Sequence, residues 1–273
     1  MRNIIKRLFV VGLIASTSCT ELDLTQLDAA SSGNWYSSYD QFRQSLNEGY
    51  REVFWPMDQE TSGMSDDWQR RDIINSIKSG TVSSEYLPAA DNWTLMYKII
   101  TRMLVFLEEL DSQSGILSES EEDLFRGEAN FMRASFWSYL ISHYGDVPFY
   151  EEEITVDESF LLARTDKFEI LEKIYEYYDD AADALPTSYD GKEYATKGAA
   201  YAMKARIALY MGDFETAADA AKKCMDLNVY SLHPDFADLF ISSTKNSNET
   251  IFKFPRSEEF NWALSGADLN VFI

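Results

Sequence analysis

One polar stretch of the chain combines the residue types that bind sugars. In WPMDQETSGMSDDWQRRD, residues 55–72, two tryptophans occur with acidic and basic side chains. Aromatic faces bind the apolar C–H side of a sugar ring, while carboxylates and guanidinium groups bind its hydroxyls. We therefore predict a carbohydrate-binding loop with the candidate contact residues Trp55, Asp67, Trp68, Arg70 and Arg71. The alternative is that these aromatics belong to the core, where packing explains most aromatic side chains.

Cys19 is the second chemically distinctive residue. It follows a basic segment, an apolar run from Leu8 to Ala15, and three small residues. The apolar run is too short to span a bilayer, because a spanning helix takes about 20 residues. This order predicts a lipoprotein signal peptide over residues 1–18 and a mature chain, 19–273, that carries its lipid on Cys19. The alternative is an ordinary signal peptide followed by an incidental cysteine.

The charge of the mature chain limits its partners. Removing residues 1–18 leaves 24 minus 3, or 21, basic residues against 46 acidic ones, which gives a net charge of −25. Nucleic acid and anionic lipid headgroups are excluded by repulsion, whereas neutral or cationic ligands are compatible. Lipidation of Cys19 would leave Cys224 without a disulfide partner, so packing alone must stabilise the fold.

No motif indicates an enzyme, a metal site or a cofactor. His143 and His233 are isolated from other metal-ligating residues, and we expect each to lie at a helix end or in a loop. There is no glycine-rich phosphate loop and no nucleophile elbow. A carboxylate pair suited to glycoside hydrolysis stays an open alternative, since nothing selects one pair among 46 acidic residues.

The elements that would position these residues are predicted to be helical, because apolar residues recur mostly every three or four positions. A helix is expected over 36–53, with Phe42, Leu46, Gly49, Tyr50 and Val53 on its buried face. Further helices are expected over 92–111, 118–144 and 167–185. The segment after residue 231 is polar, with a short extended piece at residues 251–254.

The helix over 118–144 has the strongest signals. Ser118 and Glu121 form a capping box at its start, and Gly145 ends it. Apolar residues lie on most of its sides, which predicts that it is buried between neighbours. Its charged residues Arg126, Glu128 and Arg133 are then expected to form structural ion pairs.

Residues 200–228 predict two closely packed helices. Small residues recur along both halves, and Gly212 lies between them. The pair resembles a tetratricopeptide unit, in which stacked helices bury a continuous core. Cys224 falls where such a unit places a small residue, so we expect it to pack rather than react.

The segment RGEANFMRASFWSYLISHYGDVPF, residues 126–149, closely resembles the signature helix of the RagB/SusD family of nutrient-uptake outer-membrane lipoproteins. Three further stretches, CTELDLTQ, ARIALYMGDFETAADAA and YSLHPDFADLF, resemble other parts of the family in the right order. The resemblance implies an all-α, tetratricopeptide-like fold over 19–273. Family members are usually longer, so we expect this chain to lack their C-terminal portion.

The resemblance also implies a function. Family members are not enzymes; they bind glycans or other nutrients and deliver them to a SusC-like TonB-dependent transporter. They are lipid-anchored at the outer membrane, and Glu21 and Asp23 after the cysteine look like the mark for surface exposure. The alternative is a helical-repeat scaffold lipoprotein with no ligand of its own. The family's ligand contacts lie in variable loops, so none is carried over to this chain.

Overall fold

The structure is a computed structural model that describes residues 35–55, 76–83, 85–113, 115–189, 194–241 and 247–253. The chain divides into two units, Met1–Ser37 and Ser38–Ile273, and the second unit carries all the helices described below. These are α2 (Tyr39–Gly49), η1 (Glu52–Phe54), α3 (Leu87–Ser112), α4 (Glu119–Tyr144), α5 (Val156–Ser159), α6 (Lys167–Ala184), α7 (Lys197–Met211), α8 (Phe214–Asp226) and η3 (Ala237–Phe240).

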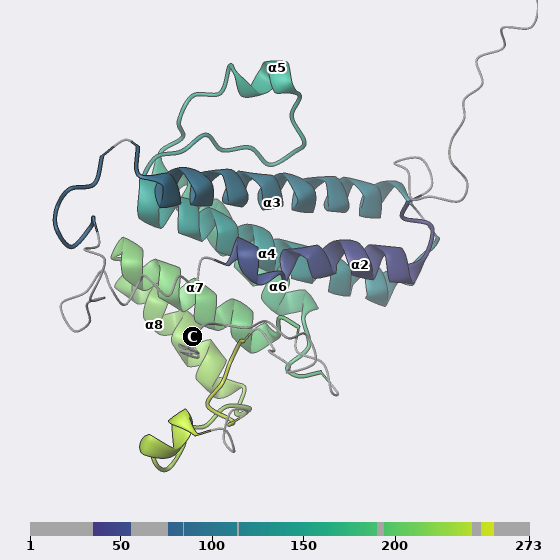
Figure 1. The fold of residues 1–273 in the computed structure, drawn as a ribbon. Coiled ribbons are helices and arrows are strands. Elements are labelled where there is room, and N and C mark those ends of the chain that lie inside the picture. Colours follow the sequence, from purple (N-terminus) through teal and green to yellow (C-terminus); the bar gives the residue numbers. More distant parts are fainter. Residues whose placement is uncertain are drawn as a thin grey trace, which may run out of the picture. The chain divides into compact units, whose positions relative to one another are not determined.

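The second unit is a stack of helices around α4 (Figure 1). Helix α4 packs against α2, α3, α6 and α7, so neighbours cover most of its circumference. Its buried side chains include Phe125, Phe131, Phe136 and Trp137. The prediction of a helix that is apolar on most sides and buried is therefore confirmed.

The predicted ends of α4 are also confirmed. The backbone N–H of Ser118 donates to Glu121 Oε2 at 2.8 Å, which completes the capping box. Gly145 follows the last helical residue with a φ of 73°, a conformation that stops the helix.

Helix α2 is shorter than predicted. Phe42, Leu46 and Gly49 are buried as expected, but the α-helix ends at Gly49 and a separate 3₁₀ turn follows. Because the helical period is interrupted there, Val53 points to solvent and is 47% exposed. Its predicted place on the buried face is wrong.

Two glycines have specific roles in the packing and connection of the later helices. A Cβ on Gly127 of α4 would lie 2.8 Å from Ala184 Cβ at the end of α6, so only glycine permits this contact. Gly212 adopts the left-handed conformation, with a φ of 84°, and turns the chain from α7 into α8. The predicted helical pair is thus confirmed, and Cys224 is buried within it.

The segment after residue 231 differs from the prediction. Ile251 and Phe252 lie in a bend rather than an extended strand, and Phe254 lies outside the described residues. Phe252 is nevertheless buried and packs within 5.2 Å, between ring centroids, of Phe131 on α4. Within the described ranges the structure has no strand, only an isolated bridge between Val147 and Thr165, and no helix there is long and apolar enough to cross a membrane.

Candidate functional site

The predicted binding loop falls largely outside the described part of the chain. Asp67, Trp68, Arg70 and Arg71 lie in residues 56–75, which the structure does not describe. Trp55 is only 7% exposed, and its indole N–H donates to the carbonyl of Gly49 at 2.8 Å. Since Phe136 and Phe252 also contact its ring, Trp55 takes the core position that the alternative expected, not a place where a sugar can stack.

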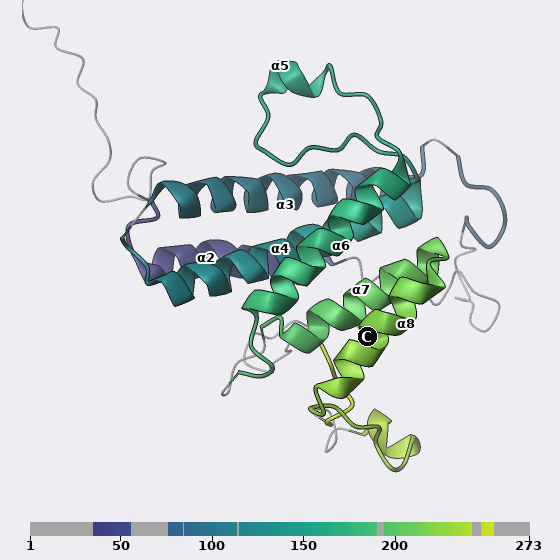
Figure 2. The same cartoon turned by 180° about the vertical axis from the view of Figure 1, so that it is seen from behind.

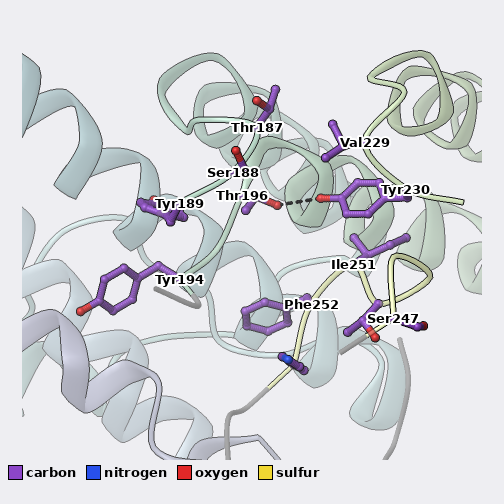
Figure 3. Close-up of a pocket in the computed structure, with 12 residues that line it drawn as sticks. Thr187, Ser188, Tyr189, Tyr194, Thr196, Val229, Tyr230, Ser247, Ile251 and Phe252 are labelled. Atoms are coloured by element: carbon purple, nitrogen blue, oxygen red, sulfur yellow. Dashed lines mark hydrogen bonds between the residues drawn. The ribbon is translucent and has the colours of Figure 1, made fainter. Parts of the chain in front are cut away.

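The structure brings a different set of residues together at the N-terminal end of α7 (Figure 3). A pocket of about 280 Å³ is formed by the α6–α7 connection, the residues after α8, and the segment 247–253. Its lining comprises Thr187, Ser188, Tyr189, Tyr194, Thr196, Val229, Tyr230, Ser247, Thr250, Ile251, Phe252 and Lys253. We call this set the aromatic pocket.

One wall of the aromatic pocket is built on the start of α7. Thr196 caps the helix by accepting a hydrogen bond from the backbone N–H of Ala199, and its hydroxyl is 3.0 Å from that of Tyr230. The ring of Tyr230 lies against Gly198, where an added Cβ would be 2.2 Å from the tyrosine oxygen. Gly198 therefore lets the ring approach the helix backbone.

The opposite wall is the segment 247–253, which pairs with the residues that follow α8. The N–H of Ser231 donates to the carbonyl of Asn248 at 3.1 Å, and the N–H of His233 donates to Glu249 Oε2 at 2.8 Å. His233 thus lies in a loop, as predicted. These bonds hold Thr250 to Phe252 against the pocket.

A buried ion pair between α2 and α4 lies next to the aromatic pocket. Glu128 is fully buried and accepts two hydrogen bonds of 2.8 Å from Arg43 of α2, which confirms its predicted pairing. The hydroxyl of Tyr50 donates to the same carboxylate at 2.8 Å and accepts from the N–H of Ala195 at 2.9 Å. The backbone next to Tyr194 and Thr196 is therefore fixed by α2 and α4.

Electrostatics favour the charged form of Arg43. Burial opposes the charge of Arg43, but the hydrogen bonds and negative charge of Glu128 outweigh it, so the pKa of Arg43 is raised. The guanidinium also lies between the rings of Phe125 and Tyr194, 4.5 and 4.3 Å from their centroids. Tyr194 is thereby held in place from its inner face.

Two hydroxyls at the aromatic pocket lack partners. Tyr189 Oη and Thr250 Oγ1 are buried, and neither has a hydrogen-bond partner among the described residues. Burial, followed by the charge of Glu128, raises the pKa of Tyr189, so its hydroxyl stays protonated. An unpaired buried hydroxyl is unfavourable, but neither oxygen has surface that a molecule in the pocket could contact.

The chemistry of the lining favours binding over reaction. It combines the rings of Tyr189, Tyr194, Tyr230 and Phe252 with hydroxyls from serine and threonine. Among the described residues, the lining contains no carboxylate, histidine or cysteine, and Lys253 is its one charged side chain. None of these described side chains has an ordinary pKa near neutrality. Apolar ring faces beside hydroxyl donors and acceptors match the two sides of a sugar.

A second cavity, of about 580 Å³, is charged. It is lined by residues of α3, α4 and α6 and by Glu151–Glu153, and it has no aromatic face. Arg126 pairs there with Asp111 at 2.5 Å, as predicted. Arg133 donates to Asn130 Oδ1 at 2.9 Å and its guanidinium lies 3.7 Å from the centroid of the Tyr177 ring. Its predicted ion pair is not found among the described residues. Burial lowers the pKa of Arg133.

The isolated histidine and cysteine have structural positions. His143 is in the last turn of α4, stacked on Tyr139, and its Nδ1 is 2.9 Å from that residue's carbonyl oxygen. Cys224 Sγ is 3.5 Å from the carbonyl oxygen of Gly198, which agrees with its predicted packing role. No group of three metal-ligating side chains occurs in the part of the chain that was described.

The sequence is similar to known proteins over most of its length. Residues 25–209 match the profile of a SusD-like family described as starch-binding and associating with the outer membrane. SusD-like protein P25 of Formosa agariphila is 25% identical over 193 residues, which are 68% of this chain and 36% of P25. SusD-like protein P2 of the same organism is 23% identical over 271 residues, 89% of this chain and 51% of P2. The chain thus spans about half, or less, of these relatives.

The fold is similar to those of solved structures. A SusD superfamily protein from Bacteroides vulgatus superimposes with a TM-score of 0.72 and 21% identity, covering 80% of this chain and 50% of that one. A laminarin-binding SusD-like protein superimposes with a TM-score of 0.70 and 21% identity, covering 80% of this chain and 51% of that one. Surface glycan-binding protein A from Bacteroides uniformis superimposes with a TM-score of 0.68 and 20% identity, covering 79% of this chain and 52% of that one.

These likenesses confirm the predicted all-α, tetratricopeptide-like fold. The family profile matches more than half of the residues, and the helix that carried the resemblance, α4, is the centre of the described structure. The chain belongs to the SusD-like family of starch-binding proteins that associate with the outer membrane.

Proposed function

We propose that this protein is a cell-surface lipoprotein that binds a glycan in the aromatic pocket, without cleaving it, and delivers it to a SusC-like TonB-dependent transporter. The observation that carries the proposal is the convergence of four aromatic rings and several hydroxyls, from three chain segments, on one pocket. The names of two fold relatives support it, since one is laminarin-binding and another is glycan-binding.

The volume of the pocket and the net charge of the chain limit the class of ligand. A volume of about 280 Å³ is just below the roughly 300–1,000 Å³ of drug-sized ligand pockets, so the pocket suits a single sugar ring of a longer chain. The net charge of −25 of the mature chain repels anionic sugars at a distance, and Lys253 of the lining can donate a hydrogen bond to a sugar hydroxyl. A neutral glycan is therefore the preferred class.

The proposed location rests on the N-terminal residues, which lie outside the described structure. A signal peptide over 1–18, a lipid on Cys19 and the acidic Glu21 and Asp23 would together place the mature chain, 19–273, on the outside of the outer membrane. The family's association with the outer membrane supports this location. The transporter partner is implied by the family resemblance.

Calorimetry with neutral oligosaccharides derived from starch and from laminarin tests the proposal. Tyr230→Ala removes a ring that lines the pocket, and we expect affinity to fall about tenfold or more, which corresponds to about 1.4 kcal/mol. Tyr210→Ala is the matched control, because Tyr210 is an exposed tyrosine of α7 that does not line the pocket. Thermal unfolding of each variant separates lost binding from lost folding.

The outcomes distinguish the alternatives. Binding that survives Tyr230→Ala but is lost in Trp68→Ala would show that the ligand binds at the loop containing Asp67, Trp68, Arg70 and Arg71. No binding of any oligosaccharide by the folded protein would favour the scaffold without a ligand. Reducing ends released over time would show an enzyme and refute the non-catalytic proposal.

A further inference from the structure

The chain between α4 and α6 forms a projecting arm, residues 148–164, that carries α5 near its middle (Figures 1 and 2). The two ends of the arm are held together at its base. The N–H of Thr165 donates to the carbonyl of Val147 at 2.9 Å, and the N–H of Lys167 donates to Asp146 Oδ1 at 3.1 Å. The arm therefore leaves and rejoins the helical stack at one place.

The arm is anchored and internally ordered by specific bonds. Tyr97 of α3 donates to the carbonyl of Pro148 at 2.7 Å, and the hydroxyls of Thr101 and Tyr150 are 3.0 Å apart. Farther out, the N–H of Thr155 donates to Glu158 Oε2 at 2.8 Å, which completes a capping box around α5. Such a preformed segment loses little conformational entropy when it binds.

The tip of the arm exposes large apolar side chains. Val156 is 72% exposed, Phe160 is 81% exposed and Leu161 is 84% exposed. All three are within the six consecutive residues Val156–Leu161, which we call the arm tip.

The arm is acidic. Glu151 is bonded to Tyr177 and Lys173 of α6 and lines the charged cavity, whereas Asp157 and Glu158 lie within the arm tip. The arm contains Glu151, Glu152, Glu153, Asp157 and Glu158 against the single basic residue Arg164, a net charge of −4, and all six are exposed. A second copy of the mature chain, with a net charge of −25, and an anionic lipid surface are both repelled. Attraction requires a surface that combines an apolar hollow with positive charge.

We propose that the arm tip, Val156 to Leu161, docks into an apolar socket of a partner protein whose rim carries lysine and arginine side chains. Both views of the fold place α5 and the α7–α8 pair on opposite sides of α3 (Figures 1 and 2). The aromatic pocket lies at the start of α7, so the partner and a glycan can be bound together. The docking proposal does not depend on glycan binding.

Site-specific photocrosslinking on intact cells tests the proposal. The full-length protein carries p-benzoylphenylalanine at Phe160, and the matched control carries it at Phe214, which is 69% exposed on α8 and outside the arm. Mass spectrometry then maps the crosslinked residues of the partner. We expect a crosslink from position 160 alone, at a site where apolar residues are bordered by lysine or arginine.

A charge test accompanies the mapping. In the variant Asp157→Lys, which keeps the capping box of Thr155 and Glu158, the yield from position 160 should fall severalfold, because a positive rim then repels the arm. Equal yields from positions 160 and 214 would overturn the proposal. A crosslink to a second copy, to lipid, or to an acidic surface would overturn it as well. Thermal unfolding confirms that the variants are folded.

Discussion

The carboxylate of Glu128 and the guanidinium of Arg43 share two hydrogen bonds of 2.8 Å at a position where Glu128 has no exposure to solvent. Replacing Arg43 by methionine keeps the apolar contacts but leaves a buried, unpaired carboxylate. We expect the free energy of unfolding to fall by about 3–5 kcal/mol, measured by urea unfolding.

The neighbouring Arg51 provides a control for this prediction. Its ion pair with Glu48, at 2.8 Å, is largely exposed, so Arg51→Met should change the free energy of unfolding by less than about 1 kcal/mol. In the double variant Arg43→Met and Glu128→Met, most of the lost stability should return, because no charge is left buried. An equally small effect of both single substitutions would contradict the structural role of the buried pair.

Gly198→Ala should destabilise the protein although it lies in a helix. Alanine normally stabilises a helix over glycine by roughly 0.5–1 kcal/mol. Here the new Cβ would lie 2.2 Å from the Tyr230 hydroxyl, so the ring must move and its contact with Thr196 is lost. We expect a net loss of about 1–3 kcal/mol in thermal unfolding, together with weaker oligosaccharide binding. A rise in stability at unchanged affinity would show that Tyr230 is not fixed against α7.

Alkaline pH should weaken the fold through its buried tyrosines. Burial raises the pKa of Tyr178 to about 12, and its hydrogen bond with Ser135 only partly offsets this. The folded-state pKa lies above the ordinary value of about 10, so the protonated hydroxyl of Tyr178 favours the folded over the unfolded chain. This contribution to the free energy of unfolding is complete below pH about 10 and is lost as the pH rises toward about 12. Burial raises the pKa values of Tyr50 and Tyr97 in the same direction.

Urea unfolding followed at about pH 9 and about pH 11 checks this alkaline effect. The free energy of unfolding should fall between the two, and the fall should be smaller in Tyr178→Phe, which has no proton to lose at that position. Absorbance of tyrosinate in the native protein gives an independent measurement. A Tyr178→Phe variant with an unchanged pH dependence would remove Tyr178 as a cause.

Lipidation of Cys19 is testable in cells. Labelled palmitate should be incorporated into the intact protein and should be absent from Cys19→Ala, because Cys224 is buried and burial raises the pKa of its thiol. Cys224→Ala is the matched control and should keep the label. Label that persists in Cys19→Ala would leave an ordinary signal peptide followed by an incidental cysteine as the better explanation.

Local signals in the sequence predicted the helices well. The capping box at Ser118, the stop at Gly145 and the turn at Gly212 each depend on residues within a few positions, so their geometry follows from the residue types. The pairing of Glu128 was predictable because a carboxylate on a buried helix face needs a partner. Its partner, Arg43, was not, since the two residues are 85 positions apart.

The aromatic pocket could not be predicted for the same reason. Tyr194, Tyr230 and Phe252 come from three separate segments, and none of these segments has a motif of its own. For Trp55, the polar neighbours in the sequence suggested a solvent-exposed ring. In the structure the rings of Phe136 and Phe252 contact it, and it is buried. The sequence shows a glycine, Gly198, near the start of a predicted helix. Only the fold shows that the ring of Tyr230 lies against this glycine.

The bond from Ala195 to the hydroxyl of Tyr50 joins residues 145 positions apart. Closing so long a loop is slow compared with forming the helical hairpins around it, and each doubling of loop length adds roughly 0.6 kcal/mol of entropy loss. The pocket wall at Ala195 should therefore mature late in folding. If the chain is exported as proposed, a translocating chain that has not yet delivered both Tyr50 and Ala195 to the same compartment would lack this pocket wall, and binding in the aromatic pocket would have to wait for both.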